Sequence, residues 1–114
     1  MMNPTTNFFK QNWVASAGDA AAGYINNWRT FDASKIIRLL HVSLEHTGAR
    51  RVRLFVTTHD GEYFRIADDD YADDQAAIWN GSLILRNVTS VGAQVLAPAA
   101  ADLNRLRIIW EELQ

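Results

Sequence analysis

Five aspartates stand close together in the stretch Asp68-Asp69-Asp70-Tyr71-Ala72-Asp73-Asp74. Carboxylate oxygens are the ligands that calcium prefers in proteins, so this stretch supplies the candidate metal ligands Asp68, Asp69, Asp70, Asp73 and Asp74. It lacks the alternating spacing, the glycine and the terminal glutamate of an EF-hand loop. Because unpaired carboxylates are costly to bury, we expect a solvated surface loop, with no cofactor required by the sequence.

Three histidines and no cysteine leave few groups for acid–base or nucleophilic chemistry. His46 and His59 lie at opposite ends of an expected strand, about 40 Å apart at about 3.3 Å per residue, too far to share a metal ion. His41 lies near Ser43 on one strand face, and no carboxylate is expected beside it. The chain also lacks a glycine-rich phosphate loop, a nucleophile elbow and a metal-binding His/Glu helix motif. We therefore predict that the protein is not an enzyme.

Arginines form the only basic concentration, at Arg38, Arg50, Arg51 and Arg53. We expect them to form ion pairs with acidic residues, within the subunit or across an interface, rather than to bind phosphate. The net charge of −2 gives no overall attraction to nucleic acid or to an anionic membrane. No apolar run approaches the roughly 20 residues of a membrane helix. Neither nucleic acid nor membrane is therefore an expected partner.

The segment Ser34–Thr57 must position these groups, because it holds the arginines and two of the histidines. Apolar residues recur at every second position, as on one face of a strand, at Ile36, Leu40, Val42 and Leu44 and again at Val52, Leu54 and Val56. A polar link of a few residues with a glycine joins the two runs, which favours a central β-hairpin. Ile37 and Leu39 fall on the opposite face, which predicts a second cover, either the N-terminal segment or a neighbouring subunit, and makes both candidate residues of a subunit interface.

Turn signals divide the rest of the chain into short segments, such as Asp60-Gly61 and Asn80-Gly81. We predict about eight short strands in an all-β fold, an antiparallel β-sandwich of jelly-roll type. A single domain is expected over residues 13–114, preceded by an extended N-terminal arm over residues 1–12. Phe8 and Phe9 in this arm predict that it docks, either on its own sheet or on a neighbouring subunit.

Tryptophan is frequent, with four residues in 114. Large aromatic side chains bury well, so most of them are expected in the core. The alternative is a carbohydrate- or receptor-binding module, in which Trp13, Trp28 or Trp79 is exposed for stacking on sugars and the acidic loop holds calcium. Burial of these side chains separates the two alternatives.

Several segments in order carry a family resemblance: KIIRLLHVSLEHTGARRVRLFV, EYFRIADDD, AAIWNGSLIL, VGAQV and LNRLRIIWEEL. Together, over residues 34–113, they resemble small β-sandwich virion proteins of tailed bacteriophages, in which a Trp-Asn-Gly-x-Leu-x-Leu strand follows a strand that ends near Thr-Gly. The sequence departs from that pattern at Asn87-Val88-Thr89-Ser90, where the family has Gly-Asp.

The resemblance implies a structural component of the phage particle, as a head–tail, tail or capsid-decorating protein. Its expected partners are other copies of itself, as a homo-oligomer, and other virion proteins. Its expected location is the virion, after synthesis in the cytoplasm of the bacterial host.

Overall fold

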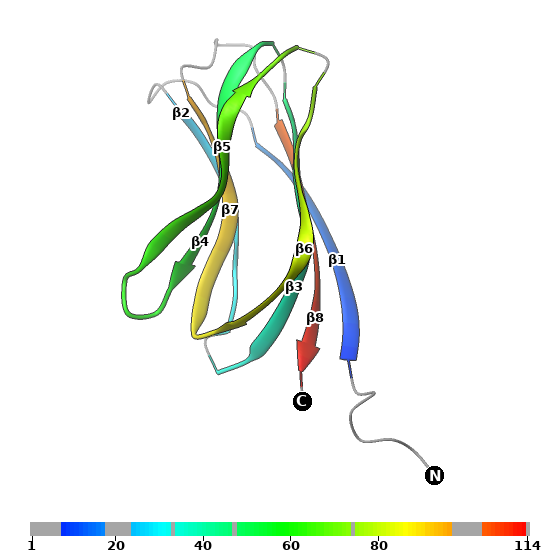
Figure 1. Cartoon of the computed structure of the whole chain (residues 1–114), viewed down its shortest axis with the longest axis vertical. Coiled ribbons are helices and arrows are strands. Elements are labelled where there is room, and N and C mark those ends of the chain that lie inside the picture. Colours follow the sequence, from blue (N-terminus) through cyan, green and yellow to red (C-terminus); the bar gives the residue numbers. More distant parts are fainter. Residues whose placement is uncertain are drawn as a thin grey trace.

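The computed structural model describes residues 8–17, 24–32, 34–46, 48–73, 75–96 and 104–113; for residues 8–17, 24–26 and 113 it describes the backbone alone. Eight strands make up most of this part of the chain (Figure 1). They are β1 (Phe8–Ala17), β2 (Tyr24–Thr30), β3 (Ile36–His46), β4 (Arg50–Thr58), β5 (Tyr63–Tyr71), β6 (Ala77–Arg86), β7 (Val88–Leu96) and β8 (Asn104–Leu113). The described ranges contain no helix that would be long and apolar enough to cross a membrane.

The strands form two four-stranded sheets that face each other as a sandwich (Figure 1). Sheet A has the strand order β1-β8-β3-β6, and sheet B has the order β2-β7-β4-β5. All pairings are antiparallel, and β1 with β8, β2 with β7, β3 with β6 and β4 with β5 form four successive pairs. A chain of strand pairs rolled into two layers in this way is a jelly roll. The predicted all-β antiparallel sandwich is confirmed.

The segment Ser34–Thr57 does not form the predicted hairpin. β3 pairs with β6 and β8 in sheet A, whereas β4 pairs with β5 and β7 in sheet B. The link after His46 therefore carries the chain from one layer to the other. Alternation records which face of a strand is apolar, but not which strand lies beside it, so the same pattern fits both arrangements.

Only β4 and β5, among the eight described strands, are consecutive and also paired. The turn predicted at Asp60-Gly61 joins them. Gly61 has a φ of +87°, a backbone conformation that glycine adopts without steric cost, and the Thr58 amide donates to the Glu62 carbonyl at 2.8 Å. By contrast, Asn80-Gly81 is no turn, because it lies inside the continuous strand β6.

An extra residue interrupts the alternation in β3. Leu39 pairs with Trp110 of β8, and His41 pairs with Ile109, the next residue along. Leu40 thus stands between two consecutive pairs as a β-bulge, in which one strand carries a residue more than its partner. The bulge reverses the parity of the side chains before it.

The residues before the bulge correct a prediction. Ile37 and Leu39 are buried in the core, at 1% and 0% exposure, so they do not lie on a second face and do not form a subunit interface. Ile36 and Leu40, which the parity had placed in the core, are only partly buried and lie on the outward side of β3.

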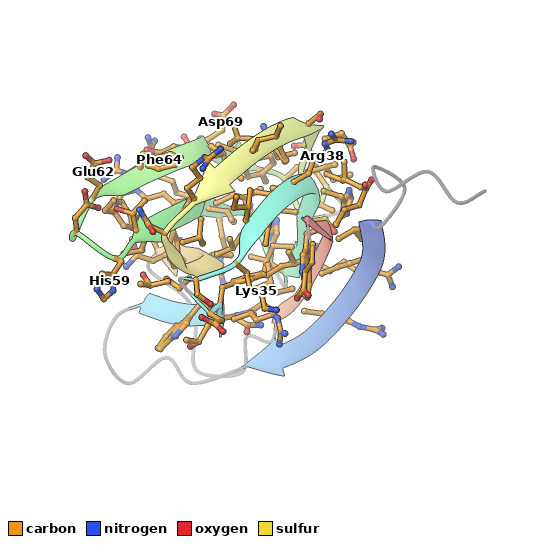
Figure 2. All side chains as sticks on the ribbon, turned by 90° about the horizontal axis from the view of Figure 1, so that it is seen from below. Lys35, Arg38, His59, Glu62, Phe64 and Asp69 are labelled. Atoms are coloured by element: carbon orange, nitrogen blue, oxygen red, sulfur yellow. The ribbon has the colours of Figure 1, made fainter. Side chains whose placement is uncertain are left out.

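The core fills the space between the two inner faces, as the view along the sandwich shows (Figure 2). Charged side chains such as Glu62 and Asp69 point away from it (Figure 2). Side chains alternate in the last strand, where Leu106, Ile108 and Trp110 are all buried. The other buried apolar residues of this core are Phe31, Ile37, Leu39, Val42, Leu44, Val52, Leu54, Val56, Ala77, Leu85, Val88, Val91, Ala93 and Val95.

One polar contact crosses this core. Asn27 in sheet B donates from its side-chain amide to the side-chain oxygen of Asn104 in sheet A, at 3.1 Å. Both residues are buried, at 6% and 4% exposure. The amide nitrogen of Asn104 has no hydrogen-bond partner. The pair therefore ties the sheets together while leaving one buried donor unsatisfied.

The acidic stretch is largely a strand, not a surface loop. Asp68, Asp69 and Asp70 belong to β5 and lie opposite Arg53, Val52 and Arg51 of β4. Opposite charges directly across an antiparallel pair stabilise a sheet, so arginines at alternate positions of β4 let aspartates occupy alternate positions of β5. Asp74 lies outside the described residues.

Strand β1 includes part of the predicted arm. Phe8 pairs with Leu113 and Asn12 with Ile109 of the same chain, so the predicted boundary at residue 12 falls inside β1. Residues 1–7 lie outside the described residues, as do the side chains of Phe8 and Phe9. The contacts of these two side chains stay a prediction.

Candidate functional site

The outward face of sheet B carries a regular array of aromatic and polar residues. Directly opposite residues of an antiparallel sheet point to the same side, and the register gives four rows across β2, β7, β4 and β5. From one end to the other, the residues of these rows whose side chains are described are Leu96, Arg51, Asp70; Gln94, Arg53, Asp68; Trp28, Gly92, Phe55, Arg65; and Thr30, Ser90, Thr57, Tyr63. We call this array the sheet B face.

The aromatic residues of this face lie on either side of a glycine. Trp28 is 52% exposed and Tyr63 is 47% exposed. Tyr63 stacks on Phe55, with ring centroids 5.2 Å apart. Gly92 lies between Trp28 and Phe55, whose strands are about 10 Å apart, two strand spacings, and Gly92 itself is buried.

Gly92 cannot carry a side chain in this position. A Cβ atom there would lie 2.5 Å from both the Cβ of Trp28 and the carbonyl oxygen of Asn27. Real carbon atoms do not approach so closely, and a well-packed site loses stability when extra methyl groups are forced in. The close packing of β2 against β7 at Trp28 therefore requires glycine at position 92.

Three guanidinium groups surround one carboxylate on the same face. Arg51, Arg53 and Arg65 approach the oxygens of Asp68 at 3.0, 3.5 and 2.9 Å, and Asp70 lies 3.8 Å from Arg51. The ion pairs predicted for Arg51 and Arg53 are thus present, within one chain. Three cations against two carboxylates leave one positive charge in excess in this group.

These contacts change how Asp68 titrates. Burial raises the pKa of Asp68. The hydrogen bond from Arg51 and the charges of Arg51, Arg53 and Arg65 lower it by more, so the pKa lies below its ordinary value. The same contact raises the pKa of Arg51. The carboxylate is therefore held in its charged form as a counter-ion and not as an acid or base.

The outward face of sheet A, which we call the sheet A face, is more apolar. Ile78 and Ile84 of its edge strand β6 are each 54% exposed. Ile36, Leu40 and Ile109 add partly buried apolar surface from β3 and β8. The strand β6 holds a single charged residue, Arg86, at its end.

His41 lies on the sheet A face between two polar partners. Its Nδ1 is 2.7 Å from the Asn80 side-chain oxygen, and its Nε2 is 2.8 Å from the Ser43 hydroxyl. An amide oxygen only accepts, so Nδ1 carries the hydrogen and Nε2 accepts from Ser43. The orienting group is a neutral amide, which stabilises an imidazolium less than the carboxylate of a catalytic triad does.

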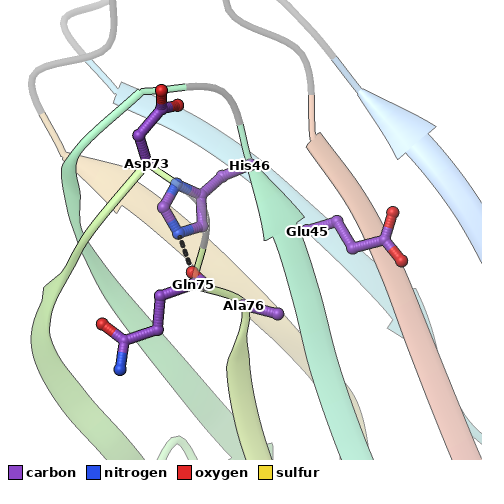
Figure 3. A pocket seen from close by; sticks show the side chains of 5 residues that line it. All are labelled: Glu45, His46, Asp73, Gln75 and Ala76. Carbon is purple, nitrogen blue, oxygen red and sulfur yellow. Dashed lines mark hydrogen bonds between the residues drawn. The ribbon is translucent and has the colours of Figure 1, made fainter.

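His46 lines a cavity of about 230 Å³ with Glu45, Asp73, Gln75 and Ala76 (Figure 3). Its two ring nitrogens lie 2.8 Å from the Gly48 carbonyl and 2.9 Å from the Gln75 carbonyl. The Glu45 carboxylate points away from the ring (Figure 3). Because backbone groups hold both nitrogens, the ring joins the β3–β4 link to the β5–β6 link and has no nitrogen left for catalysis.

The predicted calcium ligands do not converge. Asp68 lies among arginines, and Asp73 accepts a hydrogen bond from the Gly48 amide at 2.9 Å. No group of three potential metal ligands occurs among the side chains that the structure describes. Asp69 and Asp70 lie on β5 as successive residues, which point to opposite sides of a strand.

The tryptophans proposed for sugar stacking do not lie on one face. Trp28 is exposed on sheet B, whereas Trp79 of sheet A is partly buried and packs against the core. Trp13 lies in β1 opposite Ile108, and its side chain lies outside the described residues. Only Trp28 fits an exposed platform among those described. The neighbours that sequence reasoning missed are Gly92, Tyr63 and Arg65; alternation within each strand placed them on a face, but only the strand order puts them beside Trp28.

Comparison with known proteins supports the fold. No protein-family model matches the sequence, and no curated protein is similar to it in sequence. Among solved structures, the chain is similar to a protein of Bacillus endospore appendages, which are described as a family of disulfide-linked pili. The two share 13% identity at a TM-score of 0.57, over 94% of this chain and 88% of the other.

Weaker likenesses extend to two other kinds of protein. The VP2 subviral particle of infectious bursal disease virus shares 11% identity at a TM-score of 0.43, over 96% of this chain and 33% of the viral chain. A family 29 carbohydrate-binding module shares 11% identity at a TM-score of 0.42, over 94% of this chain and 81% of the module. At such identities a likeness concerns the fold, and the chain is an antiparallel β-sandwich.

Proposed function

We propose that the chain is a structural component of a bacteriophage particle, as a head–tail connector, tail or capsid-decorating protein, and that it acts through contacts with other copies and other virion proteins. The observation that carries this proposal is the edge strand β6. It exposes Ile78 and Ile84, at 54% each, and has one charged residue in ten. An uncharged, apolar edge strand favours pairing with another chain.

The neighbouring edge makes the contrast clear. β5, the edge of sheet B, carries Arg65, Asp68, Asp69 and Asp70, and charges on an edge strand oppose pairing with another chain. The edge strands β5 and β6 thus differ in charge, which controls whether an edge pairs with another chain. We infer that copies associate through the sheet A face and not through β5.

The family resemblance supports the phage assignment, and the fold shared with a pilus protein supports a structural role. In this proposal the chain binds and does not catalyse, and its place is the virion after synthesis in the host cytoplasm. The chain contains no cysteine, so the proposed contacts do not use disulfide bonds from this sequence, unlike those of the disulfide-linked pili.

The association is tested by light scattering after gel filtration and by electron microscopy of the purified protein. We expect a mass of several chains for the natural sequence and a smaller mass for Ile84→Glu and for Ile78→Glu. Ser82→Glu adds the same charge to an exposed position of the same strand and is the matched control, so it should disturb association less. A monomeric natural chain, or equal effects of all three substitutions, would contradict the proposed interface.

The phage assignment needs a separate measurement. Mass spectrometry of particles from the parent phage should detect the chain at a fixed ratio to the major capsid protein, and cryo-electron microscopy should place it in the head, neck or tail. Its absence from purified particles would rule out a virion role, whatever the oligomeric state in solution.

A further inference from the structure

We propose that the sheet B face binds a carboxylated saccharide, whose rings lie on Trp28 and whose carboxylate meets Arg65. This site is separate from the association proposed above, which uses the other sheet. Two of the four large apolar side chains that are strongly exposed, Trp28 and Tyr63, lie on this face. Both are aromatic, and aromatic rings offer a flat apolar surface to a ligand.

The shape of the face favours a flat ring as its occupant. Trp28, Gly92, Phe55 and Arg65 form one row across the four strands, so the row runs for about 14 Å at the usual strand spacing. Gly92 at its centre adds no side chain to the face, and it is itself buried, close beneath the Cβ of Trp28. The row therefore fits a short chain of rings that lies across the strands.

Polar groups on both sides of the row fit a ligand rich in hydroxyls. Gln94 and Arg53 lie in the row on one side, and Thr30, Ser90 and Thr57 lie in the row on the other. Amides and hydroxyls both donate and accept hydrogen bonds, as a sugar hydroxyl does. A protein partner would need a larger continuous apolar surface than single rings between polar groups.

The charge of the face favours an acidic sugar over a neutral one. Arg51, Arg53 and Arg65 share Asp68, and among the described side chains Asp70 is the only other carboxylate in an ion pair with them, which leaves one positive charge in excess. Arg65 stands in the same row as Trp28, and a guanidinium has five N–H donors, more than its contact with Asp68 uses. A nucleic-acid site would need more positive charge than this chain has, at a net −2.

The test begins with an array of carboxylated oligosaccharides, which includes galacturonate, glucuronate, mannuronate and sialic acid, and with their methyl esters as neutral partners. Calorimetry with the best ligand then gives affinities. We expect the acid to bind more tightly than its ester and to lose affinity with added salt, as charge contacts do. Equal binding of acid and ester would overturn the role of Arg65, and an array without any carboxylated ligand would overturn the site.

Two substitutions separate the parts of the site. Trp28→Ala should weaken both acid and ester about tenfold, which corresponds to about 1.4 kcal/mol, whereas Arg65→Gln should weaken the acid alone. Ile78→Ala removes an equally exposed apolar side chain from the other sheet and should leave binding unchanged. Circular dichroism checks the fold of each variant. Binding that survives Trp28→Ala, or a preference for oligothymidylate over every saccharide, would overturn the proposal.

Discussion

Three arginines lie 2.9 to 3.5 Å from the carboxylate of Asp68. This residue shows which contacts of a charged side chain can be predicted from the sequence. The run of aspartates predicted a solvated surface loop that supplies candidate calcium ligands, because carboxylates are costly to bury and their oxygens lie at short spacing. The parity of Arg51 and Arg53 predicted ion pairs, which the structure contains. What neither pattern gave was that β5 continues through Asp68 to Tyr71, opposite the arginines of β4, which turns candidate ligands into counter-ions.

Asp68 should make stability depend on pH in the acid range. Its pKa is lowered in the folded chain from an ordinary value of 3.8, since the hydrogen bond and charges of the arginines outweigh the opposing effect of burial. A carboxyl with a lowered folded pKa contributes stability above its unfolded pKa and loses that contribution as pH falls through the folded pKa. We expect the free energy of unfolding, measured in urea, to fall as pH drops below about 4.

Substitution identifies the share of Asp68 in this dependence. Asp68→Asn should flatten the curve of unfolding free energy between pH 4 and pH 2, without abolishing the slope. Hydrogen bonds from Ser34 and Thr58 lower the pKa values of Asp32 and Asp60 as well, and these groups remain. Asp70→Asn is the control, because it removes the same charge from a side chain that is 79% exposed. Parallel curves for the natural chain and Asp68→Asn would contradict this account.

At the scale of elements, β3 shows where sequence reasoning succeeded and where it failed. The strand itself, and the burial of Val42 and Leu44, followed from alternation. The core position of Ile37 and Leu39 did not, because a one-residue bulge at Leu40 changes parity and leaves no mark in an apolar run. The predicted pairing of β3 with β4 was wrong for a similar reason, since the neighbours of a strand depend on the whole sheet and not on that strand alone.

Deleting Leu40 should be tolerated better than deleting a residue nearby. Without Leu40 the strand alternates regularly, and Leu39 and Val42 still face the core. Deleting Ser43 instead turns Leu44 outward and Glu45 inward, which loses the burial of a leucine, about 2–5 kcal/mol, and buries a carboxylate. We expect the Leu40 deletion to unfold cooperatively in a thermal scan and the Ser43 deletion to lack a folded baseline. Equal loss of stability in both would show that Leu40 does not act as the extra residue.

At the scale of the molecule, the two sheets present different chemistry to their surroundings. Sheet A exposes isoleucines on an edge strand with a single charged residue, Arg86, which suits contact with other copies. Sheet B exposes aromatic rings among arginines and hydroxyls, which suits a saccharide. The sequence contained both sets of residues, and its all-β pattern predicted the sandwich. Their division between two faces follows from the jelly-roll order, in which six of the seven links between the eight described strands change sheets.

The two layers depend on a buried polar contact that can be tested by a double-mutant cycle. Asn27 of β2 donates to Asn104 of β8 across the core at 3.1 Å, and the Asn104 amide nitrogen has no partner. Asn27→Leu should destabilise the fold by about 1–3 kcal/mol, because it removes a donor from an amide that stays buried. Replacing both partners by apolar groups of similar size removes the unsatisfied groups together, so the double variant with Asn104→Leu should recover at least part of that loss. Chemical denaturation of the four proteins gives the coupling energy. Single effects that simply add would mean that the contact contributes nothing to holding the sheets together.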